Sequence, residues 1–409
     1  MVAAQLAYKL LGFAILTQLA RGLGPSEFGL LMFALATCEL AALATEFGSS
    51  SYLTREIAVY PNHALRLLGE VLGVRLIFAG VYLLTMAAVA ITLPHGQHGV
   101  FLAIAIYAGL KDLGRAYGAA FYGARRVALA AAPFASHLAV LATGVWLALH
   151  HSSGTAAVAG AYLVAGLWLL GAFWFLARQF GPVRPSVGAW RRVVATSLPL
   201  FGLGLLTMIQ LRIDSTLLGM LRPFADVANY AASARLFEAS QSIVRPLVQV
   251  FLPIVAGLAA ERAYRQLRHS LIRLTALALI AGTFTALAVA VVADDAIRIV
   301  YGPEFAPAAE VLRIHFASTP FVFVGAVAMF HLTALRRERA AMLCAAVCLV
   351  LNVGLDLLLI PGAGAPGAAW ATLAAEGLMA LSLLAMTWRT LARATAATPP
   401  AAEVAAPVR

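Results

Sequence analysis

The chain is divided into apolar segments, each about as long as a helix that crosses a lipid bilayer. Such a helix takes about 20 mostly apolar residues. Apolar residues make up 62% of the chain and charged residues only 11%, against roughly a quarter charged in a soluble domain. The sequence therefore excludes a soluble globular protein and leaves no room for a sizeable soluble domain. It predicts twelve spans, at about 2–21, 28–50, 68–93, 100–123, 127–149, 155–177, 197–220, 227–258, 271–293, 311–335, 340–360 and 367–388.

Turn and helix-start signals separate these segments. Examples are Gly24-Pro25-Ser26-Glu27, Pro94-His95-Gly96, Gly302-Pro303-Glu304 and Pro361-Gly362-Ala363-Gly364. Segment 227–258 is too long for one straight span, and Pro246 and Pro253 are predicted to kink it. The first segment contains Lys9 and has no small-residue cleavage site, so we interpret it as a span and not as a signal peptide.

The positions of the basic residues predict the orientation of the chain. Loops after the even-numbered segments, together with the C-terminal tail, hold nineteen arginines, Arg75 counted among them. Loops after the odd-numbered segments hold three: Arg21, Arg222 and Arg298. Because basic residues accumulate in cytoplasmic loops, both termini are predicted to be cytoplasmic. The same placement explains the net charge of +11 without nucleic-acid binding.

Two stretches of the sequence match each other weakly, which suggests an internal repeat. Tyr122-Gly123-Ala124-Arg125-Arg126 and Thr333-Ala334-Leu335-Arg336-Arg337 each end a span and are followed by an Ala-rich span. Parallel six-helix repeats are one known transporter architecture; chance similarity between Ala-rich helices is the alternative. The predicted organisation is an N-terminal six-helix lobe (1–180), a basic cytoplasmic linker (181–196), a C-terminal six-helix lobe (197–391) and a disordered tail (392–409).

Charged residues within the spans carry the functional prediction. Each would cost about 2.5 to 3.5 kcal/mol at a central lipid-facing position, so they must line a hydrated interior or pair between helices. On segment 227–258, Arg235, Glu238, Ser242 and Arg245 form one polar stripe. The favoured interpretation is one cavity between the two lobes. The charged residues within the spans are the cations Lys9, Lys111, Arg115, Arg212, Arg235, Arg245 and Arg313 and the acids Glu39, Glu46, Asp112, Asp214, Glu238, Asp356 and Glu376.

The cations are candidates for binding phosphate, because a guanidinium fork matches phosphate oxygens. Intramembrane acids are candidates for ion coupling. Among them Asp214 and Glu46 rank first, since Glu238 lies one turn from Arg235 and is expected to be its ion-pair partner. His137, His315 and His331 are proton carriers or packing residues. The predicted substrate ligands are Lys111, Arg115, Arg212, Arg235, Arg245 and Arg313; the coupling candidates are Asp214, Glu46, Glu238 and Asp356.

Several catalytic signatures are absent from the sequence. It has no GxxxxGK[ST] loop for ATP and no HExxH or paired-cysteine motif for a metal. Cys38, Cys344 and Cys348 all lie in apolar segments, where they are interpreted as inert core residues. Asp294 and Asp295, in the connection 294–310, are interpreted as capping and solvating residues. We therefore expect no enzyme activity, no cofactor and no metal.

Several motifs resemble those of a known membrane family. The run Ala20-Arg21-Gly22-Leu23-Gly24-Pro25-Ser26-Glu27-Phe28-Gly29-Leu30 is one, and Glu46-Phe47-Gly48-Ser49-Ser50 with Arg55-Glu56-Ile57-Ala58 follows it. Later matches are Arg212-Ile213-Asp214 with Leu218-Gly219, Tyr301-Gly302-Pro303-Glu304-Phe305-Ala306-Pro307-Ala308-Ala309, and Asn352 through Pro361 to Gly367-Ala368-Ala369-Trp370-Ala371-Thr372. Nearly the whole chain thus resembles the Wzx-type polysaccharide flippases, in the superfamily that also holds the MATE exporters.

The resemblance implies an all-α, MATE-like fold with two six-helix lobes around a cationic cavity. It implies movement of polyprenyl-diphosphate-linked oligosaccharide to the periplasmic leaflet of a bacterial inner membrane, for O-antigen (lipopolysaccharide), capsule or exopolysaccharide assembly. Expected partners are that lipid-linked oligosaccharide, the bilayer, a polysaccharide polymerase and a chain-length regulator. Related flippases concentrate cations on helices 1, 2 and 8, whereas helix 2 here carries acids, which suggests a larger part for helix 4. An ion-coupled small-molecule or drug exporter and a membrane glycosyltransferase or polymerase are the alternatives.

Overall fold

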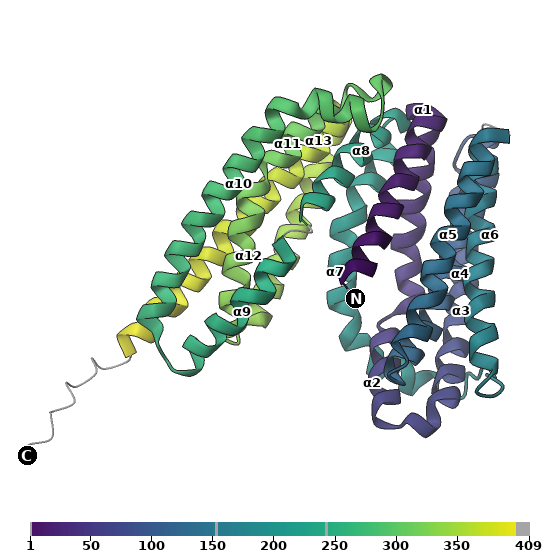
Figure 1. Cartoon of the computed structure of the whole chain (residues 1–409), viewed down its shortest axis with the longest axis horizontal. Helices are drawn as coiled ribbons and strands as arrows, with labels where there is room; N and C mark the ends of the chain where they lie inside the picture. Colours follow the sequence, from purple (N-terminus) through teal and green to yellow (C-terminus); the bar gives the residue numbers. More distant parts are fainter. Residues whose placement is uncertain (1, 152–153, 242–243, 398–409) are drawn as a thin grey trace, which may run out of the picture. The chain divides into compact units, whose positions relative to one another are not determined.

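The computed structural model describes residues 2–151, 154–241 and 244–397, and every regular element within these ranges is helical (Figure 1). The first seven α-helices are α1 (Val2–Glu46), α2 (Ser49–Val59), α3 (Ala64–Ile91), α4 (His98–Gly123), α5 (Val127–His151), α6 (Thr155–Arg178) and α7 (Trp190–Leu221). The others are α8 (Phe224–Gln241), α9 (Val244–Ala260), α10 (Tyr264–Val300), α11 (Ala308–Ala317), α12 (Thr319–Ala334) and α13 (Glu338–Ala397). Three short 3₁₀ helices cover Pro61–His63, His95–Gln97 and Pro303–Phe305.

The two longest helices each contain a break at a glycine. In α1, Gly24 has φ 72° and ψ 173°, and in α13, Gly364 has φ 59° and ψ −135°. Glycine adopts positive φ at little cost, and a proline lies beside each break, Pro25 in α1 and Pro366 in α13. A straight helix of 45 residues would be about 67 Å long, more than twice a hydrocarbon core of about 30 Å. Each helix therefore provides two spans, at the breaks that the sequence predicts.

The described ranges contain thirteen α-helices, two of which are broken at a glycine. By length and composition alone, seven helical stretches of the described residues qualify as membrane spans, and two of these contain the glycine breaks. Helix α4 fails that test because Lys111, Asp112 and Arg115 lie near its middle. Helix α4 thus fails the test because of candidate site residues.

Large apolar side chains on several of these helices are exposed. Leu84 of α3 is 74% exposed, Val291 of α10 is 81% exposed and Leu358 of α13 is 75% exposed. A soluble protein rarely leaves extended apolar surface in water, whereas such a surface on a membrane helix contacts lipid tails. The fold is that of a multi-pass membrane protein.

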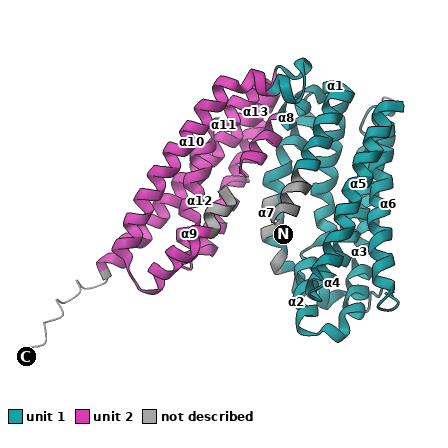
Figure 2. Cartoon of the chain, viewed as in Figure 1, with its two compact units in different colours: residues 1–232, 297–306 teal, residues 233–296, 307–409 magenta. Residues whose placement is uncertain are grey.

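The chain packs into two compact units (Figure 2). Unit 1 comprises residues 1–232 and 297–306, and unit 2 comprises residues 233–296 and 307–409. The short piece 297–306 joins unit 1 through aromatic contacts, since Phe305 packs edge to face on Phe28 with ring centroids 5.8 Å apart. The division into lobes at 1–180 and 197–391, with a linker and a tail, stays a prediction.

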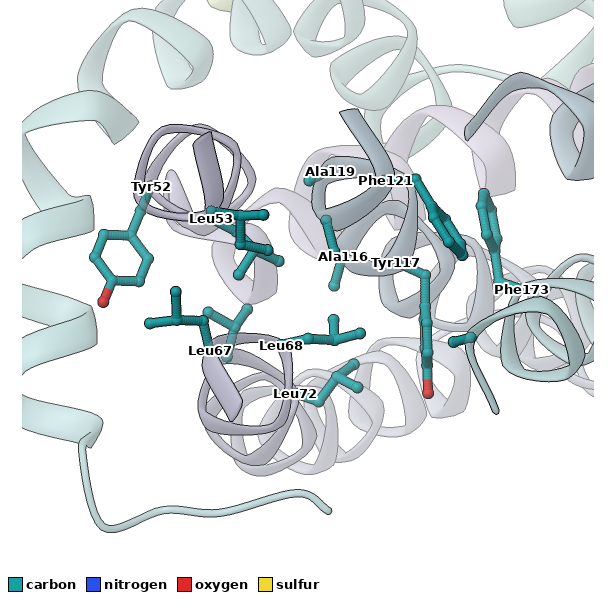
Figure 3. Packing of buried hydrophobic residues seen from close by; sticks show 14 of the residues in the cluster. Tyr52, Leu53, Leu67, Leu68, Leu72, Ala116, Tyr117, Ala119, Phe121 and Phe173 are labelled. Atoms are coloured by element: carbon teal, nitrogen blue, oxygen red, sulfur yellow. The ribbon is translucent and has the colours of Figure 1, made fainter. Parts of the chain in front are cut away.

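Unit 1 is held together by packing among α2, α3, α4 and α6. In α4 and α6, Phe121 and Phe173 stack with ring centroids 6.3 Å apart. Leu53 of α2, Leu68 of α3 and Ala116 of α4 meet in the same buried cluster (Figure 3). Small residues on α4 let the neighbouring helices approach closely, as is common between membrane helices. In unit 2, α12 packs against α9 and α13.

The two matched stretches adopt the same turn. Arg125 and Arg336 have φ of 59° and 54°, and the following residue donates its backbone N–H to a carbonyl of the preceding helix, at 2.8 Å for Arg126 and 2.9 Å for Arg337. This is a Schellman-type helix end, with an arginine in the left-handed position. The turn at Arg262, with φ 56°, repeats the geometry. The weak sequence match therefore corresponds to a shared local structure.

The connection predicted at residues 294–310 is shorter than expected. Helix α10 continues through Asp294 and Asp295 to Val300, and α11 begins at Ala308. Both aspartates therefore lie in a helix and not in the predicted connection, but both are exposed to the surroundings, and Asp294 pairs with Arg313. The kinks predicted at Pro246 and Pro253 in segment 227–258 stay predictions, since residues 242–243 lie outside the described part of the chain.

Candidate functional site

One carboxylate in unit 1 gathers three of the predicted cations. Glu39, in the second half of α1, accepts a hydrogen bond from the Lys111 ammonium at 2.7 Å. Its other oxygen lies 3.0 Å from the guanidinium of Arg212 of α7, and Arg115 of α4 adds a further electrostatic attraction. We call these four residues the Glu39 cluster. It joins helices α1, α4 and α7 at one point.

The Glu39 cluster carries more positive than negative charge. Glu39, Lys111 and Arg212 are 17%, 22% and 20% exposed, so the group is mostly buried but not closed. The Nε atom of Arg212 is buried and has no acceptor among the described residues. Arg115 likewise has no direct hydrogen bond or ion pair within that part of the chain, and it is attracted electrostatically to Glu39. The cluster therefore has spare donors and spare positive charge for an anion.

A stack of aromatic rings lies beside Lys111. The Lys111 ammonium sits 5.6 Å from the centre of the Tyr107 ring, and that ring stacks on His137 at 5.8 Å with an interplanar angle of 11°. His137 is buried, with no hydrogen-bond partner for either ring nitrogen among the described residues. In unit 2, by contrast, His315 bonds to Ser233 at 2.6 Å and His331 to the Val327 carbonyl at 2.8 Å.

A second polar group in unit 1 is centred on Arg75 of α3, whose side chain is 0% exposed. Its guanidinium donates to the Ser49 hydroxyl at 2.9 Å, the Asp112 carbonyl at 2.7 Å and the Ser50 hydroxyl at 2.8 Å. It also lies 3.3 Å from the Asp112 carboxylate and 3.4 Å from that of Glu46. We call Arg75, Glu46 and Asp112 the Arg75 node. The node links α4 to α1 and α3 at Asp112, the residue that follows Lys111.

Counting Arg75 among the loop arginines was wrong. It lies inside α3, about three helical turns after the start of that helix, and it pairs there with two acids. Its position within the apolar segment 68–93 was the signal in the sequence. Glu39 was recognised as an intramembrane acid but not as the residue that gathers the cations, because helical spacing does not reveal a neighbour on another helix.

The other predicted cations lie in unit 2 and are not part of the Glu39 cluster. Arg235 forms an ion pair with Glu238 at 2.8 Å, which confirms the expected pairing along α8. Arg313 pairs with Asp294. The side chain of Arg245, like that of Lys9, lies outside what the structure describes. Whether any of these residues binds substrate stays a prediction.

The acids proposed for ion coupling have different surroundings. Asp214 is 6% exposed and accepts a hydrogen bond from the Tyr230 hydroxyl. Glu46 accepts from the backbone N–H groups of Gly48 and Ser50, both at 2.8 Å, and so caps the start of α2. Asp356 is fully buried in α13. The capping role of Glu46 leaves Asp214 as the stronger candidate in unit 1, and coupling itself stays a prediction.

The arrangement suits the binding of an anion with several oxygens. Guanidinium and ammonium groups bind phosphate through charge-assisted hydrogen bonds, and an ionisable cluster inside a membrane protein marks a functional site by default. Among the described residues, no group of three or more His, Cys, Asp or Glu could hold a metal ion. The Glu39 cluster is cationic because it has three basic residues and one carboxylate.

Comparisons with known proteins concern the family and the fold of the chain. A family model described as "Polysaccharide biosynthesis protein" matches residues 1–259. None of the curated protein sequences compared with the chain matches it.

Solved structures with the same fold cover nearly the whole chain. A multidrug resistance MATE family transporter of the MOP superfamily, in an inward-facing conformation, matches with a TM-score of 0.73 and 12% identity over 96% of both chains. The lipid II flippase MurJ, in an inward closed conformation, matches with a TM-score of 0.69 and 13% identity over 97% of this chain and 89% of its own. A MOP superfamily transporter from Pyrococcus furiosus gives a TM-score of 0.58 and 13% identity over 96% and 93%. At these identities the likeness concerns the fold, and it confirms the predicted all-α, MATE-like class.

Proposed function

The chain belongs to the polysaccharide biosynthesis protein family, and from this premise we propose that it moves polyprenyl-diphosphate-linked oligosaccharide across a bacterial inner membrane. The movement is from the cytoplasmic to the periplasmic leaflet, and the glycan serves O-antigen, capsule or exopolysaccharide assembly. The observation that carries this proposal is the Glu39 cluster, in which Lys111, Arg115 and Arg212 surround a single carboxylate. The shared fold with a lipid II flippase supports a lipid-linked substrate.

The cluster can exchange one anion for another. Glu39 pairs with Lys111 and with Arg212, so these mostly buried cations have a counter-ion within the protein. A diphosphate offers several oxygens to the guanidinium forks and can displace the carboxylate from them. Glu39 can form its ion pairs with Lys111 and Arg212 again when the substrate leaves. Such a site binds the phosphates that all polyprenyl-diphosphate substrates share and does not select the sugar.

We propose that both termini are cytoplasmic, since the basic residues concentrate on that side. In a background without Cys38, Cys344 and Cys348, a cysteine at Gly188, in the connection before α7, is expected to react with a membrane-impermeant thiol reagent only from the cytoplasm. A cysteine at Ala363, at the break in α13, is expected to react from the periplasm, and both positions are exposed. Labelling of Gly188→Cys from outside intact cells would refute this orientation. Ser153, the other periplasmic candidate, lies outside the described residues.

The function is tested by reconstitution in vesicles. The purified chain is expected to move a fluorescent oligosaccharide on polyprenyl diphosphate between leaflets, measured as loss of protection from an impermeant quencher. The matched control is the same oligosaccharide on a polyprenyl chain without phosphate, which should stay in its leaflet because it offers nothing to the Glu39 cluster. Equal movement of both lipids would contradict the proposal. Export of a small organic cation without movement of either lipid would also contradict it and would favour a drug exporter.

A further inference from the structure

An open apolar cavity of about 320 Å³ lies on unit 1, and none of the charged residues described above lines it. Its walls come from α3, α4 and α6, and Pro185 of the connection between α6 and α7 also lines it. Three of its side chains are about half exposed: Leu76 at 47%, Leu167 at 55% and Trp174 at 52%. No acidic residue is among those that line it. The cavity is therefore accessible from outside the unit and suited to a hydrocarbon chain.

The connection that borders this cavity is fixed to α3. The backbone N–H of Ser186 donates to the Gly69 carbonyl at 3.0 Å. A Cβ atom at Gly69 or Gly73 would lie 2.3 Å or 2.4 Å from a backbone oxygen of the connection, so only glycine permits this approach. Between the two glycines, Glu70 pairs with Arg66 at 3.0 Å and with Arg192. The connection is thus held on the helix, and Pro185 with it.

Two exposed arginines lie next to this cavity. The guanidinium of Arg178 lies 5.3 Å from the ring of Trp174, which lines the cavity. Arg184 immediately precedes Pro185, which also lines it. Neither arginine forms an ion pair with a described residue. The acid Glu70 pairs instead with Arg66 and Arg192. Arg178 also lies 4.8 Å from the ring of Phe175. An apolar cavity beside two arginines without an acidic partner among the described residues complements a molecule with a hydrocarbon chain and an anionic head.

The cavity is separate from the Glu39 cluster. Leu113, which lines it, stands two residues from both Lys111 and Arg115. Two residues correspond to about 200° around a helix, so the cavity and the cluster lie on opposite sides of α4. One lipid-linked substrate held at the Glu39 cluster therefore does not also fill this cavity.

We propose that the cavity and its two arginines bind an anionic phospholipid of the surrounding bilayer. One acyl chain lies along the apolar walls, and the head-group phosphate contacts Arg178 and Arg184. Basic sites between membrane helices recognise anionic head groups in this way. The bound lipid also covers the exposed ring of Trp174, which is typical of the membrane interface. The proposal does not depend on the identity of the transported substrate.

Native mass spectrometry of the purified full chain tests the proposal with added phosphatidylglycerol and, separately, phosphatidylcholine. Two arginines near the head group should favour phosphatidylglycerol by roughly thirtyfold. Replacing both with glutamine, Arg178→Gln and Arg184→Gln, should remove that preference. Gly171→Leu should reduce binding of both lipids, because Gly171 lines the cavity and its Cβ would have no atom within 4 Å. The control is Gly160→Leu on the same helix, where a Cβ also meets nothing within 4 Å but which does not line the cavity.

Three results would overturn the proposal. Equal retention of the two lipids would show that the arginines do not recognise the charge of the head group. Unchanged lipid binding by Gly171→Leu would show that the lipid does not lie in the cavity. Displacement of phosphatidylglycerol by inorganic phosphate or by a polyprenyl diphosphate would show a soluble anion site or a substrate site instead. Should Gly171→Leu fail to fold, as judged by its unfolding temperature, the arginine variants still decide the question.

Discussion

Replacing Arg75 with methionine is expected to destabilise unit 1 by about 3–5 kcal/mol, because it leaves two acids of the Arg75 node without their cation. Arg75 and Asp112 are 0% and 1% exposed, so neither gains water when the pair is broken. The guanidinium also satisfies the hydroxyls of Ser49 and Ser50 at the start of α2. The measurement is the thermal unfolding of purified variants in detergent, together with the yield of monodisperse protein.

A matched control and a rescue sharpen this test. Arg66→Met removes an arginine of the same helix that is 72% exposed, and exposed ion pairs contribute only about 0 to 1 kcal/mol. Combining Arg75→Met with Asp112→Leu should recover part of the lost stability, since an apolar pair can replace a buried ion pair. An Arg75→Met protein that unfolds at the wild-type temperature would show that the node does not hold α4 in place.

Replacing Arg115 with glutamine is expected to slow transport of the diphosphate-linked oligosaccharide by roughly 10- to 100-fold without changing the unfolding temperature. The fold-change corresponds to losing one hydrogen bond to a charged group, about 1.5–3 kcal/mol. Stability should hold because Arg115 makes no direct hydrogen bond or ion pair with the described residues. The vesicle assay measures the rate, and Arg115→Lys, which keeps the charge, should recover part of it.

Two further variants distinguish substrate binding from a general loss of charge. Arg393→Gln changes an exposed arginine near the end of α13 and should leave transport unaffected. Glu39→Gln removes the internal competitor for the cations, so it should tighten binding of polyprenyl diphosphate and destabilise the empty protein. If Arg115→Gln transports at the wild-type rate and Glu39→Gln leaves binding unchanged, the Glu39 cluster is not the phosphate site.

The positions of the spans and their breaks could be predicted because they depend on local chemistry. An apolar run of about 20 residues has to be a helix in a bilayer, where every backbone polar group must bond within its own segment. The breaks at Gly24 and Gly364 lie in the predicted turn signals, since glycine and proline act through their own backbone. The pairing of Arg235 with Glu238 could be predicted for the same reason, because the two residues are one turn apart on the same helix.

Contacts between helices could not be predicted in this way. Helical spacing places Lys111 and Arg115 on one face of α4, but it does not state which neighbouring helix that face meets. Only the packing brings Glu39 of α1 and Arg212 of α7 to it. The same limit explains why Arg75 was assigned to a loop, because its acidic partners lie on α1 and α4.

The sequence by itself determined the class of this protein: its helices, their approximate ends, its membrane environment and its family resemblance. Each of these rests on residues adjacent in the chain or on composition. The tertiary structure decided which charges meet, as in the Glu39 cluster and the Arg75 node, and which connection lies against α3. The physical reason is that ion pairs and close backbone contacts act over a few ångströms, a distance that only the packing of helices sets for residues far apart in the chain.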